Sequence, residues 1–292
     1  EVDSSRARFE QAFGAVWSGE AESDGFNRLV LAAGLSWREV AVLRGYCKYQ
    51  LQTGVPFSQT YMEETLVRYP LIARLLVELF AARFEPCRDD KAGSDVCNSL
   101  HRGLIDIVPV ADREKIATIL EEVAADRALD RESQFDACDD ALAILLEKVA
   151  SLDEDRILRS FITVIKATLR TSFYQVKNGK HRDYISFKFD AALLPDLPKP
   201  RPYREIFVYS PWVEGVHLRF GPVARGGLRW SDRREDFRTE VLGLVKAQMV
   251  KNTVIVPVGS KGGFFVKRSP VGGDRDAVLA EGIACYKRFI NG

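Results

Sequence analysis

The period of the apolar residues changes along this chain, and that change limits its fold more than any other feature. Up to about residue 171, apolar residues recur mostly at three- and four-residue steps, which is the helical period. Beyond that point, segments such as 183–189 alternate between apolar and polar residues, as half-buried strands do. The sequence therefore predicts an α+β protein, with an all-helical region at 1–152 and an α/β domain at 153–292.

Several helices of the first region carry end signals. Residues 36–52 begin with Ser36 as N-cap and Glu39 three positions later, which together form a capping box. Pro70 lies inside the helical stretch 60–84 and is expected to divide it into two helices, because proline removes a backbone donor. The same period predicts further helices at 112–128, 136–150 and 152–171.

The second region combines strands with two more helices. Strands are expected at 183–189, 204–210 and 215–221, and helices at 236–251 and 275–290. Residues 253–258 are apolar and β-branched, which is typical of an interior strand, and another strand begins at 264–266. The order strand, helix, strand indicates an α/β domain.

Composition excludes several classes of function. The chain has 292 residues, is 46% hydrophobic and has a formal net charge of +1, so it lacks the basic excess of a nucleic-acid-binding protein. No apolar run approaches the roughly 18 residues of a membrane span, and from the charged residues at its start we expect no secretory signal. Five widely spaced cysteines indicate reduced thiols in a cytoplasmic protein. Cys87, Cys97 and His101 match no usual zinc spacing, so we expect no metal site.

Three sets of residues between 221 and 267 are candidates for binding an anion. Arg225, before Gly226 and Gly227, offers a planar fork that suits a carboxylate. Gln248 and Lys251 share a helix face and together suit one carboxylate, although a solvated helix end explains them equally. Lys261 lies between a buried strand and two glycines, where a ligand can approach the backbone, but it also fits an exposed turn.

The other conspicuous residues favour structural roles. Arg229, Arg233 and Arg234 are expected to be ordinary surface or ion-pair residues beside Asp232, Glu235 and Asp236. His181 and His217 stand alone in strand contexts without a neighbouring nucleophile motif. The segment GSKGG leads into a strand and is therefore no phosphate loop, and these residues contain no G-x-G-x-x-G dinucleotide fingerprint.

Long segments of this sequence resemble one family. Residues 203–290, which include EIFVYSPWVEGVHLRFGPVARGGLRWSDRREDFRTEVLGLVKAQMVKN, are similar to the catalytic region of the large NAD-specific glutamate dehydrogenases of bacteria. Residues 35–66 and 151–175 are similar to the same family. The resemblance implies a substrate-binding domain of glutamate-dehydrogenase type.

The resemblance also implies roles for individual residues. Arg225 stands where the family has the lysine of a Lys-Gly-Gly segment that holds the distal carboxylate of the substrate. Gln248 and Lys251 match the pair that binds the α-carboxylate, and Lys261 matches the catalytic lysine. The loop before Lys261 is one residue shorter than the family pattern.

For the whole enzyme, the resemblance implies conversion of L-glutamate to 2-oxoglutarate and ammonium by a cytoplasmic homo-oligomer, with no nucleic acid or membrane partner. NAD is expected to bind a Rossmann domain that lies, with the general-acid aspartate, downstream of Gly292. Two alternatives stay open at this point. The chain could belong to another amino-acid dehydrogenase, or to a non-enzymatic helical regulatory module that binds a dicarboxylate.

Overall fold

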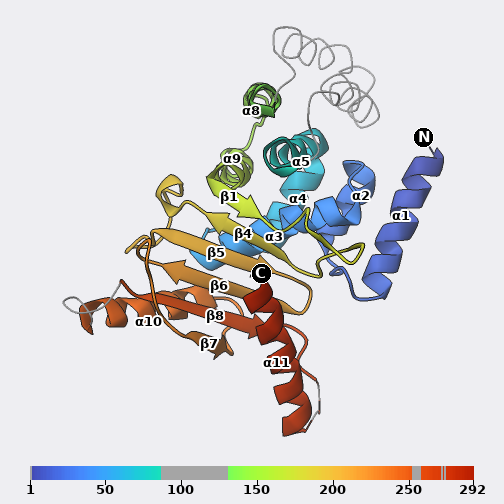
Figure 1. The fold of residues 1–292 in the computed structure, drawn as a ribbon. Coiled ribbons are helices and arrows are strands. Elements are labelled where there is room, and N and C mark those ends of the chain that lie inside the picture. The colour runs from blue at the N-terminus through green and yellow to red at the C-terminus, as the bar shows by residue number, and fades with distance from the viewer. Residues whose placement is uncertain (1, 87–130, 252–257, 271, 273) are drawn as a thin grey trace. The chain divides into compact units, whose positions relative to one another are not determined.

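The computed structural model describes residues 2–86, 131–251, 258–270, 272 and 274–292 (Figure 1). Within it the chain divides into two compact units. Unit 1 comprises Glu1–Arg44 and Phe57–Ile165, and unit 2 comprises Gly45–Pro56 and Lys166–Gly292. The expected domain boundary between residues 152 and 153 stays a prediction about the whole protein.

Unit 1 is helical, as its sequence period predicts. The capping box at the start of α3 is confirmed, because the Ser36 backbone N–H donates to Glu39 Oε2 at 2.7 Å and the Glu39 N–H donates to Ser36 Oγ at 3.3 Å. The expected break at Pro70 is also confirmed, since α5 begins at that residue. The helical elements are α1 (Val2–Trp17), η1 (Gly25–Arg28), α2 (Leu29–Ala32), α3 (Trp37–Thr53), α4 (Gln59–Arg68), α5 (Pro70–Phe84), α8 (Arg131–Leu146) and α9 (Leu152–Ala167). The helix predicted at 112–128 lies outside the described residues.

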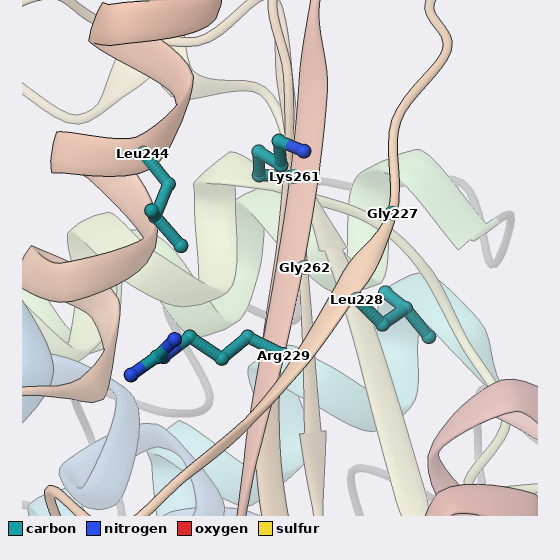
Figure 2. Close-up of a pocket in the computed structure, with 6 residues that line it drawn as sticks. All are labelled: Gly227, Leu228, Arg229, Leu244, Lys261 and Gly262. Atoms are coloured by element: carbon teal, nitrogen blue, oxygen red, sulfur yellow. The ribbon is translucent and has the colours of Figure 1, made fainter.

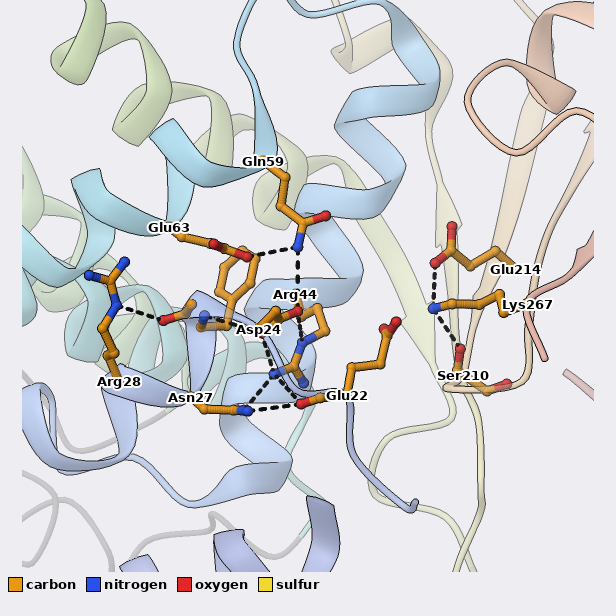
Figure 3. A network of polar contacts seen from close by, with 12 residues as sticks. Glu22, Asp24, Asn27, Arg28, Arg44, Gln59, Glu63, Ser210, Glu214 and Lys267 are labelled. Atoms are coloured by element: carbon orange, nitrogen blue, oxygen red, sulfur yellow. Dashed lines mark hydrogen bonds and ion pairs between the residues drawn. The ribbon is translucent and has the colours of Figure 1, made fainter. Parts of the chain in front are cut away.

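A buried polar network holds the first part of unit 1 together (Figure 3). Arg44 is fully buried and donates to both carboxylate oxygens of Asp24, at 2.8 and 2.9 Å, and to Asn27 Oδ1 at 2.7 Å. Asp24 also accepts from the Phe26 backbone N–H at 3.1 Å and so caps η1. A buried guanidinium requires such partners, because an unpaired charge in the interior is strongly destabilising. The network therefore fixes η1 against α3.

Unit 2 is built on a six-stranded sheet in the order β1-β4-β5-β6-β8-β7. All neighbouring pairs are antiparallel except β7 and β8, which run parallel. The strands are β1 (Thr168–Thr171), β4 (Ile185–Phe189), β5 (Arg204–Tyr209), β6 (Val213–Arg219), β7 (Leu228–Ser231) and β8 (Ser260–Val266); β2 (Val176–Lys177) and β3 (Lys180–His181) form a separate hairpin. A short helical turn, η2 (Ala191–Leu193), follows β4. The α+β class is confirmed.

Most predicted elements of this unit agree with the structure, including the helices α10 (Phe237–Lys251) and α11 (Arg275–Asn291). Two predictions were wrong at one end. The strand expected to begin at 264–266 begins four residues earlier, at Ser260, so Lys261 lies within β8, because residues 260–263 pair with β6. The helix expected at 152–171 stops at Ala167, and Thr168–Thr171 form β1 instead, because these residues pair with β4 and that tertiary pairing overrides the helical period. The strand predicted at 253–258 lies outside the described residues.

Helices cover both faces of the sheet. The second half of α3 packs its tyrosines on one face, with the Tyr46 ring 4.5 Å from Phe187 and the Tyr49 ring 4.2 Å from Phe189. On the same face, α10 lies against β6 and β8. The other face receives α11, whose Cys285 and Phe289 join a buried cluster with Val208. In Figure 1, α10 and α11 accordingly lie on opposite sides of β8.

Among the described residues, no helix is both long and apolar enough to cross a membrane. Cys47, Cys138 and Cys285 are buried, and none of these three described cysteines forms a disulfide. Burial, followed by a hydrogen bond to Glu281, raises the pKa of Cys285 to about 12, so this thiol is neutral at physiological pH.

We predict that Phe187→Ala destabilises unit 2 by about 3–5 kcal/mol, the usual cost of deleting a large core side chain. Phe187 is fully buried, and α3 approaches it so closely that a Cβ on Gly45 would lie 2.9 Å from its ring. Denaturant unfolding followed by tryptophan fluorescence measures the change. Leu193→Ala is the control, because Leu193 is 54% exposed and should change stability by less than about 0.5 kcal/mol. Equal effects of the two variants would contradict the assigned core.

Candidate functional site

The candidate site begins at β8, the strand that carries Lys261. This strand pairs with β6 on one side and with β7 on the other. Side chains alternate across a strand, so Lys261 and Gly263 share a face. A Cβ on Gly263 would lie 2.5 Å from Val241 Cγ2 of α10, which identifies this face as the one that α10 covers. Lys261 therefore lies on the α10 side of the sheet.

An open pocket of about 230 Å³ lies between β7, β8 and α10 (Figure 2). Its lining combines glycine backbone with two cationic side chains and two leucines: Gly227, Leu228, Arg229, Leu244, Lys261 and Gly262. Figure 2 shows Leu244 reaching from the helix toward the opening that Lys261 and Arg229 flank. The structure thus brings two of the predicted site residues, Gly227 and Lys261, into one pocket.

The glycine pair before β7 runs directly beside β8. The Ser260 N–H donates to the Arg225 carbonyl oxygen, and the Gly262 N–H donates to that of Gly227, both at 3.2 Å. A Cβ on Gly226 would lie 1.5 Å from the Ser260 carbonyl oxygen, so no other residue fits this position. The glycine at 226 is required by close backbone approach, as glycines beside ligand sites often are.

The Arg225 side chain is exposed, and the pocket lining does not include it. Its backbone nevertheless ties the site together, since it forms a parallel bridge with Gly259 and accepts a hydrogen bond from Gln248. The carboxylate clamp expected at Arg225 stays a prediction.

The Gln248 side chain forms a hydrogen bond within the protein. Its Nε2 donates to the Arg225 carbonyl oxygen at 3.1 Å, and its Oε1 is buried without a hydrogen-bond partner within the described part of the chain. Gln248 thus links α10 to the glycine segment. Lys251 is the last residue of α10, and the position of its side chain lies outside what the structure describes.

Arg229 is a pocket residue that the sequence reasoning missed. Arg229 forms an ion pair with Glu240 of α10 and with none of the nearby Asp232, Glu235 and Asp236. Glu240 also accepts a hydrogen bond from Ser231 Oγ at 2.6 Å. Arg233 pairs with Asp236 and Arg234 with Glu235, which agrees with the expected role as surface or ion-pair residues. Strand alternation could have revealed Arg229, because it lies two positions after Gly227 and so faces the same way.

Neither histidine singled out in the sequence lines the pocket. His217 pairs with Gly262 across β6 and β8, and a Cβ on Gly262 would lie 2.9 Å from its ring, so it lies on the face opposite Lys261. Burial and then the charge of Arg219 lower the pKa of His217. His181 belongs to the β2–β3 hairpin.

A search for metal-ligating side chains gives no cluster of three in the part of the chain that the structure covers. Cys87, Cys97 and His101 lie outside that part. What the pocket does offer is the ammonium group of Lys261 beside exposed glycine backbone, an arrangement that suits a small anion, while the Arg229 guanidinium in the lining is paired with Glu240.

Two families match this chain. Residues 141–292 match the family described as bacterial NAD-glutamate dehydrogenase, catalytic domain. Residues 21–86 match the family described as glutamate dehydrogenase, helical motif 3.

Individual relatives match over almost the whole chain. The NAD-specific glutamate dehydrogenase of Mycobacterium tuberculosis is 49% identical over 98% of this chain, and that of Halomonas elongata is 48% identical over 98%. The enzyme of the same name from Pseudomonas aeruginosa is 49% identical over 97%. The chain spans only 15–16% of the length of these relatives.

We predict that Gly226→Ala lowers stability by about 3 kcal/mol, because the added methyl overlaps the Ser260 carbonyl and overpacking at close contacts costs this much. Gly227→Ala is a matched control one residue away, since nothing lies within 4 Å of its Cβ position. Chemical denaturation of both variants gives the comparison. If both were equally stable, the close approach of the glycine segment to β8 would be refuted.

Proposed function

Since the chain belongs to the bacterial NAD-glutamate dehydrogenase family, we propose that the protein containing it oxidises L-glutamate to 2-oxoglutarate and ammonium with NAD as hydride acceptor. The observation that carries this proposal is the shared pocket of Lys261 and the glycine segment. A carboxylate substrate needs cationic or amide donors around an opening of ligand size, and this pocket supplies them.

In the proposed complex, two clamps fix the substrate. Arg225 holds the distal carboxylate, and Gln248 with Lys251 holds the α-carboxylate. Clamping at two points selects a dicarboxylate of the right length and fixes which face of Cα is presented for reaction. Gln248 then exchanges its hydrogen bond to the Arg225 carbonyl oxygen for one to the substrate carboxylate.

Lys261 is the proposed catalytic residue. It projects on the α10 face of β8, on the side that carries the pocket. From there its ammonium group can orient the water that attacks the imine carbon and stabilise the oxygen that develops negative charge.

The described residues do not fit NAD. Dinucleotide sites of the usual kind place the pyrophosphate at a glycine-rich turn from a strand into a helix. Gly262 and Gly263 instead lie within β8, and Gly226 and Gly227 lead into β7. We therefore assign NAD to a domain outside this chain. We also propose a cytoplasmic homo-oligomer; the reduced state of the three described cysteines supports that compartment.

Lys261→Ala in the full-length enzyme should reduce kcat by about 10³-fold, the combined effect of losing an acid–base group and its charge. Steady-state formation of NADH from glutamate measures it. Lys246→Ala is the control, because Lys246 is exposed on α10 and does not line the pocket. A Lys261→Ala enzyme with wild-type kcat would rule out the catalytic assignment.

Arg225→Met should remove the preference for an acidic side chain, because it keeps length and deletes the charge. The quantity to measure is the ratio of kcat/KM for glutamate to that for norvaline, which we expect to fall by about tenfold or more, the equivalent of one charge-assisted hydrogen bond. Arg234→Met, which removes an exposed arginine elsewhere, should leave the ratio unchanged. An unchanged ratio in Arg225→Met would place the distal carboxylate elsewhere.

A further inference from the structure

An ion pair with no exposure to solvent joins β5 to the first turn of α10. Glu205 and Arg238 are both 0% exposed, and the guanidinium donates through Nε and Nη2 to the two carboxylate oxygens at 2.6 and 2.8 Å. Burial by itself lowers the pKa of Arg238, but the charge of Glu205 and the hydrogen bonds to it reverse this and raise the pKa above its usual value. The pair therefore stays charged.

Gln52 of α3 holds the same turn by its backbone. Its Oε1 accepts from the Arg238 N–H at 3.1 Å, and its Nε2 donates to the Arg234 carbonyl oxygen at 2.9 Å. One side chain thus bonds two backbone groups around the start of the helix. Together with the ion pair, it gives α10 three directional attachments at one end.

The opposite end of α10 carries Gln248 and Lys251. Ten residues separate Arg238 from Gln248, which corresponds to about 15 Å of helix. A tilt of about 5° at the first turn would therefore move Gln248 by about 1 Å. Displacements of that size at an active site can cost about 10²-fold in rate. The attachment at the first turn controls where the far end of the helix lies.

Stability alone does not explain a charged pair at this place. Replacing a buried ion pair by apolar residues of similar volume is often neutral or stabilising, because two charges lose their hydration. Apolar packing by Phe237, Val241 and Val245 already holds α10 on the sheet, but such contacts have no preferred direction. The two hydrogen bonds between Arg238 and Glu205 do have a preferred direction, and this direction is the property that the ion pair adds to the apolar packing.

We propose that Glu205, Arg238 and Gln52 form a positioning device that sets the orientation of α10, so that Gln248 and Lys251 meet a substrate bound beside Lys261. This inference rests on the proposed function, and it gives a role in substrate binding to three residues that do not touch the substrate. The pair acts through the helix, and its effect is on substrate binding.

The test removes the pair without leaving a lone charge. Glu205→Met combined with Arg238→Met in the full-length enzyme should raise KM for glutamate and for 2-oxoglutarate about tenfold or more. KM for NAD should stay within twofold of wild type, and kcat should fall less than KM rises, because the clamps act on bound substrate before and during reaction. The melting temperature should stay close to that of the wild type.

The same sheet offers a matched control pair. Lys267 Nζ lies 2.6 Å from Glu214 Oε1, the two side chains are 7% and 8% exposed, and Lys267 also donates to the Ser210 carbonyl oxygen at 3.1 Å (Figure 3). Neither residue lines the pocket. Glu214→Met combined with Lys267→Met should leave KM for glutamate within twofold of wild type.

The outcomes separate the two proposals. A wild-type enzyme that forms no NADH from glutamate would overturn the proposed function and the positioning role with it. If the wild type is active, two results would overturn the positioning role alone. One is an unchanged KM for glutamate in the Glu205–Arg238 double variant. The other is an equal change of that KM in the Glu214–Lys267 control variant. If the double variant does not fold, Gln52→Met decides: a rise in KM for glutamate of about threefold or more supports the device, and an unchanged KM refutes it.

Discussion

The close backbone packing of β8 is the constraint on which the candidate site depends. Three glycines make it possible: Gly226 against the Ser260 carbonyl, Gly262 against Leu228 and His217, and Gly263 against Val241. Side chains at these positions would separate β7 and α10 from β8 by the width of a methyl group or more. Because they are absent, strand, helix and glycine segment lie near enough for Lys261 and Arg229 to flank one pocket.

Directional polar contacts complement the apolar core in both units. Arg44 with Asp24 in unit 1, and Arg238 with Glu205 in unit 2, are each buried forks that join residues far apart in sequence. In unit 2, Tyr46 and Tyr49 pack on β4 in an aromatic core. These apolar contacts stabilise the unit, but they do not fix the orientation of one element against another. Ion pairs with fixed geometry then select one arrangement among the many that an apolar core alone would tolerate.

Local patterns predicted the parts of the site that depend on neighbours in sequence. Lys261 and Gly227 were found from glycines next to an apolar strand, and α10 from its helical period. Arg229 was expected to be a surface or ion-pair residue and does form an ion pair, but its partner Glu240 lies across a turn, on the next helix. The start of α10 shows the same limit. The backbone N–H of Arg238, in the first turn of this helix, donates to the side chain of Gln52, 186 residues earlier in the chain.

The sequence by itself determined which segments are helices and which are strands, wherever side-chain periodicity decides, and it determined the chemical types gathered between residues 221 and 267. Only the tertiary structure decided that Thr168–Thr171 form a strand, that β7 runs parallel to β8, and that Arg229 belongs to the pocket. The physical reason is the range of the interactions. Periodicity and capping act within a few residues, whereas strand pairing and buried ion pairs join residues that only the folded chain brings together.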